Sequence, residues 1–465
     1  MEVEKFEQVA LRLGDLLVDT MFENHVFIVG GAVRDYLLGR PINDIDLVVD
    51  LPFGGIGFAE WVTREMKVYK KDSNPLVYGQ FGTAMFRLWD QEFEVVMSRS
   101  EAYTEGSRKP EVRFGTIEQD AFRRDFTVNS LMLNISNGAI SDLTGEGIKA
   151  LSTGVLRTTS DPESIFKEDP LRMLRAARFA GQLTNEKEGI KMFQIGTKEV
   201  AAMKSNRAKL SDISKERIQS ELVKILKSKS PLVGIDILVK TGLMDFIIPN
   251  MSRMVGRTQN KHHVADVYGH TMMALTHTVP VLEQRLAVLL HDIGKPATAF
   301  QKPDGEFSFH GHETMGADMT EAILKDLKFP TATIVKVKKL VKMHMLTKTW
   351  GEQAEKVSKK SLRKFVAKAG EDLNDLLGVI HADNMAHAPA SCMPEQVHFI
   401  EVMIAELKQR KEPTIMPVNG QDIMFNFDVK QGKEVGELLA IAQEIFFENP
   451  LLTNSELIEL VKEQR

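Results

Sequence analysis

Cysteine is almost missing from this chain of 465 residues, in which Cys392 is the only one. No internal disulfide can form, and a chain built without disulfides suits a reducing cytoplasm. No run of about eighteen apolar residues occurs, so the sequence predicts no membrane span and no membrane partner. Residues 1–5 are acidic and lack a secretory pattern. We therefore expect a cytoplasmic protein.

A large excess of positive charge is also missing. The chain has 59 Lys and Arg against 64 Asp and Glu, for a net charge of −5. This balance argues against a protein that coats nucleic acid without selectivity, but it allows RNA binding through a local basic face. The hydrophobic content of 43% is typical of globular proteins, and 465 residues exceed one ordinary core. We expect two to four domains.

Two adjacent glycines follow a strand-like apolar run. Residues 27–29 are apolar, Gly30 and Gly31 come next, and residues 32–38 have helical spacing. A turn of this kind presents backbone N–H groups at a helix N-terminus, where phosphate is stabilised. A Gly-Gly pair by itself is most often only a turn.

Two aspartates stand two positions apart a little further along. Alternation in a strand places Asp44 and Asp46 on one face, with Ile45 toward the core. Neighbouring carboxylates repel unless a cation lies between them, and oxygen ligands suit Mg²⁺. Residues 77–97 read as a hairpin whose second strand carries Glu94, either a third metal carboxylate or an outward-facing strand residue. A phosphate turn beside paired carboxylates predicts nucleotidyl transfer.

The motif Gly-Gly-Ala-Val-Arg-Asp at 30–35, with Asp-Ile-Asp at 44–46, resembles the polymerase-β-type nucleotidyltransferases that build the CCA end of tRNA, and related poly(A) polymerases. The resemblance implies an α+β head with a small mixed sheet, followed by an all-α neck, HD domain and tail. It implies that Asp44 and Asp46, helped by Glu94, hold Mg²⁺. Gly31 and Arg34 then hold the triphosphate, in a turn that includes Gly30.

Paired arginines open the next motif. Arg123 and Arg124 precede Asp125, which we expect to cap a following helix, and Asn129 lies on that segment. From the residues alone, paired arginines are usually a solvated face. The resemblance implies instead that Arg123, Arg124 and Asn129 contact the sugar and triphosphate.

Residues 168–179 combine a helix start with three regularly spaced arginines. Pro170 suits the first helical turn, with Asp169 near the cap. Arg172, Arg175 and Arg178 recur every three residues on one face, and spacing alone favours a solvated stripe. The resemblance implies that Asp169 and Arg172 read the Watson–Crick edge of the incoming base, with the other two arginines nearby. Cytosine and adenine share an amine beside an acceptor, whereas uracil and guanine would leave buried groups unpaired.

A second set of chemical groups lies beyond residue 262. A single buried histidine is more often structural, but the order His…His-Asp…Asp resembles the HD superfamily of metal-dependent phosphohydrolases. The resemblance implies a divalent transition-type metal bound by His270, His291, Asp292 and Asp383. His312 and His344 are candidates for a second ion.

The predicted domains are a nucleotidyltransferase head (1–145), a neck with base recognition (146–255), an HD domain (256–395) and a helical tail (396–465). The predicted function is template-independent addition of CCA to the 3′ end of tRNA from CTP and ATP, releasing pyrophosphate. The alternatives are CC-only or A-only addition, a poly(A) polymerase, an HD phosphohydrolase acting on RNA ends, and a silent RNA-binding scaffold. The segment 107–112 is either a surface loop or the mobile segment of CCA-adding enzymes. The tail is either structural or a tRNA contact.

Overall fold

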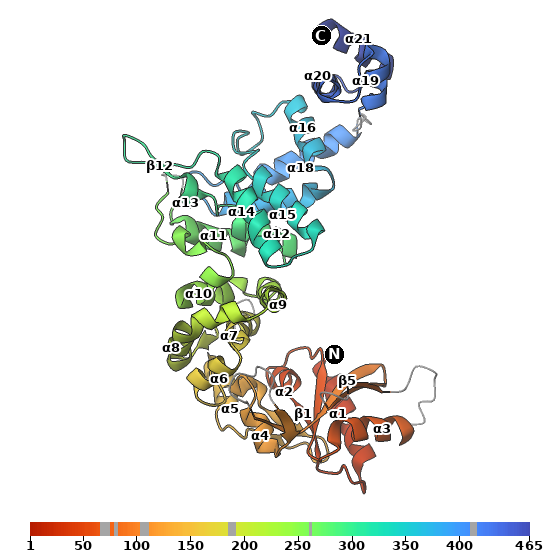
Figure 1. Ribbon diagram of the computed structural model, residues 1–465, viewed down its shortest axis with the longest axis vertical. Helices are drawn as coiled ribbons and strands as arrows, with labels where there is room; N and C mark the ends of the chain where they lie inside the picture. Colours follow the sequence, from red (N-terminus) through yellow and green to blue (C-terminus); the bar gives the residue numbers. More distant parts are fainter. Residues whose placement is uncertain (66–74, 79–81, 103–110, 185–191, 260–262, 410–415) are drawn as a thin grey trace. The chain divides into compact units, whose positions relative to one another are not determined.

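The computed structural model describes residues 1–65, 75–78, 82–102, 111–184, 192–259, 263–409 and 416–465 (Figure 1). Contacts within the chain divide it into two compact units, Met1–Ile247 and Ile248–Arg465. The predicted head and most of the neck fall in the first unit, and the predicted HD domain and tail fall in the second. The residue boundaries of the four predicted domains stay predictions.

A seven-stranded mixed sheet forms the centre of the first unit, in the order β3-β4-β5-β2-β1-β8-β9. β2 and β5 run parallel, while the other neighbouring strands are antiparallel. The α+β head with a mixed sheet is thus confirmed. The strands are β1 (Val26–Val29), β2 (Ile45–Val49), β3 (Leu76–Tyr78), β4 (Thr83–Leu88), β5 (Gln91–Met97), β8 (Met132–Asn134) and β9 (Ile140–Ser141).

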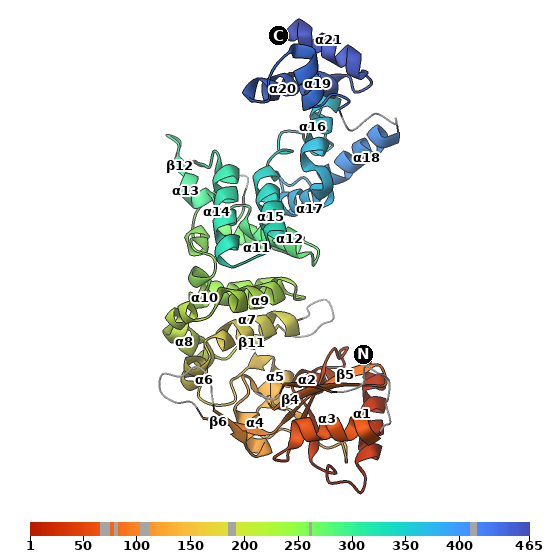
Figure 2. The ribbon, with the colours of Figure 1, turned by 45° about the vertical axis from the view of Figure 1, so that its right-hand side comes forward.

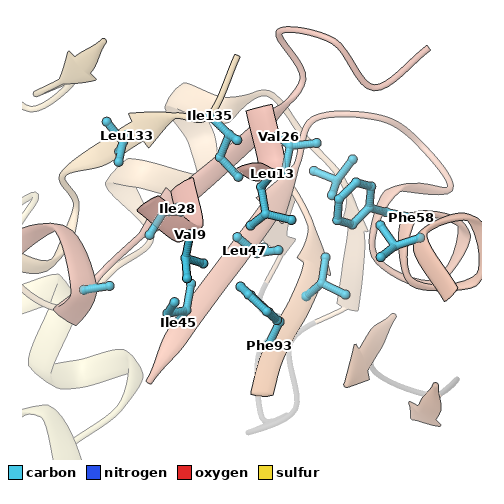
Figure 3. Close-up of a cluster of buried hydrophobic side chains, with 14 of the residues drawn as sticks. Val9, Leu13, Val26, Ile28, Ile45, Leu47, Phe58, Phe93, Leu133 and Ile135 are labelled. Atoms are coloured by element: carbon cyan, nitrogen blue, oxygen red, sulfur yellow. The ribbon is translucent and has the colours of Figure 1, made fainter. Parts of the chain in front are cut away.

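Two helices pack on one face of this sheet. Figure 3 shows Val9 and Leu13 of α1 (Val3–Leu17) and Phe58 of α3 (Gly54–Glu65) with side chains of β1, β2 and β5. Burial of each such side chain contributes about 1.5–3 kcal/mol. Ile45 and Leu47 of β2 belong to this cluster, so the pleat turns Asp46 to the opposite face. The predicted alternation in β2 is confirmed.

The predicted hairpin is also confirmed. β4 and β5 are joined through Trp89 and Asp90, which both adopt positive φ, 52° and 62°. Two left-handed residues in a two-residue turn match the right-handed twist of hairpin strands. The turn fixes the register of β5, and therefore the position of Glu94.

The second hairpin, β6 (Arg99–Ala102) with β7 (Glu111–Phe114), covers part of the segment predicted as a loop. Residues 111 and 112 belong to β7, whereas residues 107–110 lie outside the described residues. The expectation of an α-helix after Asp125 is wrong, because Thr127–Asn129 form a single 3-10 turn. Only Ser130 and Leu131 separate this turn from β8, which leaves no length for an α-helix.

The neck consists of helices that pack in pairs. α7 contacts both α9 and α10 (Figure 2). α10 can lie close to α7 and α9 because residue 234 is glycine. A Cβ at this position would lie 2.7 Å from Ile225 Cγ2 and 3.0 Å from Ala177 O. A short parallel pair, β10 (Val155–Leu156) with β11 (Gln194–Ile195), accompanies them. The helices of the neck are α5 (Gly147–Thr153), α6 (Pro162–Glu168), α7 (Leu171–Leu183), α8 (Thr197–Asn206), α9 (Lys215–Leu226) and α10 (Pro231–Thr241), whereas α4 (Ile117–Phe122) belongs to the head.

In the described residues of the second unit, the strands are β12 (Phe300–Gln301) and β13 (Phe307–Ser308), and the other regular elements are helices. Its last three helices share a hydrophobic cluster of their own. No helix among the described residues combines the length and apolarity needed to cross a membrane. The helices are α11 (Val267–Thr276), α12 (Leu282–Leu290), α13 (Lys295–Thr298), α14 (His312–Asp326), α15 (Thr331–Met343), α16 (Lys359–Ala369), α17 (Leu373–Met385), α18 (Gln396–Gln409), α19 (Gly420–Phe427), α20 (Lys433–Glu448) and α21 (Asn454–Gln464).

Candidate functional sites

Three carboxylates meet at the middle of the head sheet. Asp44 directly precedes β2, Asp46 lies within it, and Glu94 is the register partner of Asp46 on the parallel strand β5. The Asp46 side chain is open to the cavity, but the protein around it replaces much of the water that would hydrate its carboxylate. This burial, followed by the charge of Glu94, raises the pKa of Asp46 to about 6. A bound cation would relieve this repulsion, so the all-oxygen donor set fits a hard divalent ion.

The glycine turn lies beside these carboxylates. Gly30 has φ +72°, and a Cβ there would lie 3.4 Å from Arg124 Nη1 and 3.8 Å from Asp46 Oδ2. Glycine is therefore required both by the backbone and by the close approach of the site. The following helix, α2 (Gly31–Leu37), carries Arg34.

A buried aspartate that the sequence analysis did not single out holds both paired arginines. Asp120 is fully buried, and its Oδ1 lies 2.5 Å from Arg123 Nη2 while Oδ2 lies 2.8 Å from Arg124 Nη2. Burial opposes ionisation of Asp120, but the two guanidinium groups outweigh it and lower its pKa. The spacings i,i+3 and i,i+4 within one helical stretch are the signal that would have identified it.

Hydrogen bonds connect the glycine-turn helix to the predicted base-reading helix. Arg34 Nη1 donates to Asn129 Oδ1 (2.7 Å), and Asn129 Nδ2 donates to Asp125 Oδ1 (3.1 Å). The other oxygen of Asp125 accepts from Arg175 Nε at 2.6 Å. Burial raises and these partners lower the pKa of Asp125, with a net lowering. Asn129 thus positions two charged neighbours through its side-chain amide.

The arginines of α7 do not form a solvated stripe. The side chains of Arg172 and Arg178 are only 12% and 9% exposed, and that of Arg175 is 35% exposed. Arg172 Nη2 donates to Arg123 O (3.1 Å). Arg178 pairs with buried Glu221 of α9 (3.2 Å), which has no short-range sequence signal because it lies on a different helix.

Asp169 lies near the start of α7 as expected: it directly precedes the N-cap residue Pro170, and its Oδ1 accepts from the backbone N–H of Leu171 (3.1 Å). Its other oxygen lies 3.3 Å from Arg217 Nη2, on α9. The sequence analysis did not single out Arg217, so its placement at this carboxylate was missed.

All thirteen head and neck residues predicted from the sequence line one cavity of about 1190 Å³ within the first unit. Additional lining residues include Arg99, Lys209, Arg217 and Lys224, which add positive charge. The predicted residues on this cavity are Gly30, Gly31, Arg34, Asp44, Asp46, Glu94, Arg123, Arg124, Asn129, Asp169, Arg172, Arg175 and Arg178. A cavity with carboxylates at one wall and arginines around it can hold a nucleoside triphosphate and a divalent cation.

The second unit brings the predicted HD residues together. His270 Nε2 lies 3.0 Å from Asp383 Oδ1, 3.3 Å from His291 Nε2 and 3.7 Å from Asp292 Oδ2. His291 Nε2 lies 3.1 Å from Asp292 Oδ2. Such separations are those of ligands around one ion with bonds near 2.1 Å. His270 Nδ1 is hydrogen-bonded to Ala386 O, and His291 Nδ1 to Val288 O. These bonds orient the two rings so that their Nε2 atoms face one another.

The candidate second ion position is adjacent. His312 Nε2 lies 3.4 Å from both His344 Nε2 and Asp292 Oδ1. Neither oxygen of Asp292 accepts a hydrogen bond among the described residues, although Lys295 Nζ is 2.7 Å away. Burial and neighbouring charges lower the pKa of His344 to about 3, so its ring is neutral at pH 7. The neutral imidazoles of His312 and His344 beside the buried Asp292 carboxylate fit a transition-type ion.

Among the described residues, the sets of three ligand atoms that lie within 4.8 Å of one another all belong to this cluster, and none includes the head carboxylates. One set contains His387, which the sequence analysis missed. Lys348 was also missed; its Nζ lies 2.8 Å from Asp383 Oδ2. A cavity of about 860 Å³ adjoins the cluster and is lined by Asp292, His312, His344 and Asp383. His270 and His291 lie buried beneath it.

Three segments of the chain match family models. Residues 26–157 match the Poly A polymerase head domain, and residues 192–254 match the Probable RNA and SrmB- binding site of polymerase A. Residues 262–379 match the HD domain. The first match contains the carboxylates, and the third contains most of the histidine cluster.

Known proteins resemble the chain over nearly its whole length. The A-adding tRNA nucleotidyltransferase of Deinococcus radiodurans is 32% identical over 428 residues, 90% of each chain. The CC-adding tRNA nucleotidyltransferase of Thermus thermophilus is 29% identical over 92% of this chain and 91% of its own. A crystal structure of the Bacillus stearothermophilus CCA-adding enzyme in complex with CTP shares the fold, with a TM-score of 0.65, 22% identity, and coverage of 98% and 97%. The chain, with its carboxylate-lined head and its histidine cluster, belongs to the tRNA nucleotidyltransferase family.

Proposed function

We propose that this enzyme adds C, C and A to the 3′ end of tRNA from CTP and ATP, releasing pyrophosphate. The observation that carries the proposal is the shared cavity, in which Asp46 and Glu94 face the same space as Asp169 and Arg172. Transfer and base selection therefore have the residues they need within one site. The single free cysteine, and substrates that occur in the cytoplasm, support a cytoplasmic location.

In the proposed reaction, the 3′-hydroxyl oxygen of tRNA forms a bond to the α-phosphorus. The bond from that phosphorus to the bridging oxygen of the β-phosphate breaks, and pyrophosphate leaves. Asp44, Asp46 and Glu94 would hold Mg²⁺, which supplies charge neutralisation at the phosphates and acidifies the attacking hydroxyl. Arg34, Arg123 and Arg124 orient the triphosphate by charge-assisted hydrogen bonds.

Base selection falls to the start of α7. The Asp169 carboxylate accepts from the exocyclic amine of C or A, and Arg172 donates to the adjacent ring acceptor. Arg217 holds the Asp169 carboxylate at 3.3 Å and restricts the directions from which it can accept. Uracil and guanine present the opposite polarity, so buried groups would stay unpaired.

The test is extension of tRNA that lacks its CCA end, with each nucleoside triphosphate alone and then in pairs. The proposal requires CTP alone to add two residues and CTP with ATP to complete CCA. The full-length relative named as A-adding favours one second candidate, addition of A alone. That candidate predicts extension only on tRNA that already ends in CC.

We further propose a separate phosphohydrolase activity in the HD region. His270, His291, Asp292 and Asp383 would hold a divalent transition-type ion, with His312 and His344 at a second one. The metal supplies an activated water when bound, and Lys295 and Lys348 flank the ligand carboxylates at 2.7 and 2.8 Å. Release of phosphate from phosphoesters after loading with Ni²⁺, Co²⁺ or Mn²⁺ tests this activity. No release with any of these metals would contradict it.

A further inference from the structure

A single aromatic ring lies among three arginines of the head and neck cavity. The guanidinium carbon of Arg178 lies 4.3 Å from the centroid of Phe179, and those of Arg34 and Arg175 each lie 5.4 Å away. Cation–π attraction acts within about 6 Å, so one ring serves three cations. Phe179 is 7% exposed and lines the cavity.

Each arginine also has its own carboxylate, supplied by a different element. Arg34 pairs with Asp35 on α2, Arg175 with Asp125, and Arg178 with Glu221 on α9. The three carboxylate partners therefore come from three different parts of the chain. The ring is the feature that they share, and it offsets part of the repulsion among three nearby positive charges.

We propose that Phe179 is a positioning residue for nucleotide binding, which holds the triphosphate-side Arg34 and the base-side Arg175 and Arg178 in one fixed arrangement. An aliphatic side chain would keep the apolar contact but would lose the negative face of the ring. The guanidinium groups would then keep their separate carboxylate partners but lose their common contact with the ring. Nucleotide binding is expected to weaken, while the transfer step itself is expected to change little.

The neighbouring ring of Phe126 supplies a matched control. It packs edge-to-face against Phe179, with centroids 5.8 Å apart, and it is fully buried. Among the described residues, no arginine lies over its ring. Phe126→Leu therefore removes an aromatic core residue from the same contact without removing the shared arginine anchor.

The experiment measures CTP binding by titration calorimetry with Mg²⁺ and no tRNA, and KM and kcat for CTP on tRNA lacking CCA. Phe179→Leu is expected to raise Kd and KM about tenfold and to change kcat less than twofold. Phe179→Met is a second ring-free variant with the same expectation. Phe179→Tyr, which keeps the ring, is expected to stay within about twofold of the wild type. Phe126→Leu is expected to bind CTP like the wild type.

The proposal rests on the proposed function, because it assigns Phe179 to the same nucleotide site. Wild-type binding and addition are therefore measured in the same series. A wild type that neither binds CTP nor extends tRNA overturns the function and this assignment together. A working wild type with unchanged CTP binding in both ring-free variants overturns the assignment alone. Equal weakening by Phe126→Leu also overturns it, since general loosening of the core would then explain the effect.

Discussion

Asp46 and Glu94 are register partners on the parallel strands β2 and β5, at the centre of the head sheet. Parallel neighbours lie about 4.8 Å apart, so the two carboxylates occupy one small region. Burial of Asp46, followed by the charge of Glu94, raises the pKa of Asp46 to about 6. A divalent cation is the simplest partner for both groups.

Replacement of Asp46 by Ala is expected to lower nucleotide addition a thousandfold or more, about 4 kcal/mol of transition-state stabilisation. The measurement is single-turnover incorporation of CTP into tRNA lacking CCA. Asp50→Ala is the matched control, because it removes a carboxylate at the end of the same strand, where it accepts from Ser98 Oγ. Near-normal incorporation by the Asp46 variant would sink the assignment of the metal site.

The Asp125–Arg175 pair predicts a dependence of stability on pH. Because the folded-state pKa of Asp125 is lowered, its stabilising contribution is complete above the unfolded value near 3.9 and is lost as pH falls through the folded value. Asp125→Asn is expected to cost about 1–3 kcal/mol at pH 7. The gap from the wild type is expected to stay constant from pH 8 to about 5 and to shrink below that.

Urea unfolding followed by tryptophan fluorescence checks this gap. Trp61 and Trp89 lie in the first unit, and Trp350 lies in the second, so a Trp350→Phe background reports on the first unit alone. A gap that does not shrink as pH falls from 5 to about 3 would show that Asp125 is not ionised in the pair.

The two active regions are expected to be separable. His291→Ala combined with Asp292→Ala removes two of the four candidate ligands of the first HD ion and should abolish metal-dependent release of phosphate. CCA addition should stay within about twofold of the wild type, because these residues lie outside the nucleotide cavity. Metal content measured by mass spectrometry provides a second readout. Loss of addition in a variant that unfolds like the wild type would contradict the separation.

Local spacing predicted the shared face of Asp44 and Asp46, but it favoured a solvated stripe for the α7 arginines, and the family resemblance was what placed these arginines at the nucleotide site. The alternation of Asp44, Ile45 and Asp46 and the three-residue spacing of the α7 arginines both follow from one strand or helix. The partners of these groups come from elsewhere in the chain, as with Glu221 on α9 for Arg178. Such pairings depend on helix packing, which no local period encodes.

The histidine cluster likewise combines ligands that were predicted from the sequence with neighbours that only the packing of helices brings together. The order of histidines and aspartates predicted the ligand set, and the structure brings its members within 4 Å of their neighbours. Lys348 was missed because a lone lysine carries no spacing signal, and α17 must pack nearby before it meets Asp383. The 3-10 turn after Asp125 was missed because the side-chain network with Asn129 overrides helical propensity.

The most direct test of the central claim, that one cavity both transfers the nucleotide and reads its base, is the ratio of kcat/KM for CTP to that for UTP. It is measured on tRNA ending before its CCA, for the wild type and Asp169→Ala. Loss of the carboxylate is expected to slow CTP and ATP ten- to a hundredfold, about 1–3 kcal/mol, and to lower the CTP-to-UTP ratio. Arg178→Ala, further along α7, is expected to change that ratio less. If Asp169→Ala slows all four nucleotides equally and leaves the ratio unchanged, α7 does not read the base and the account is contradicted.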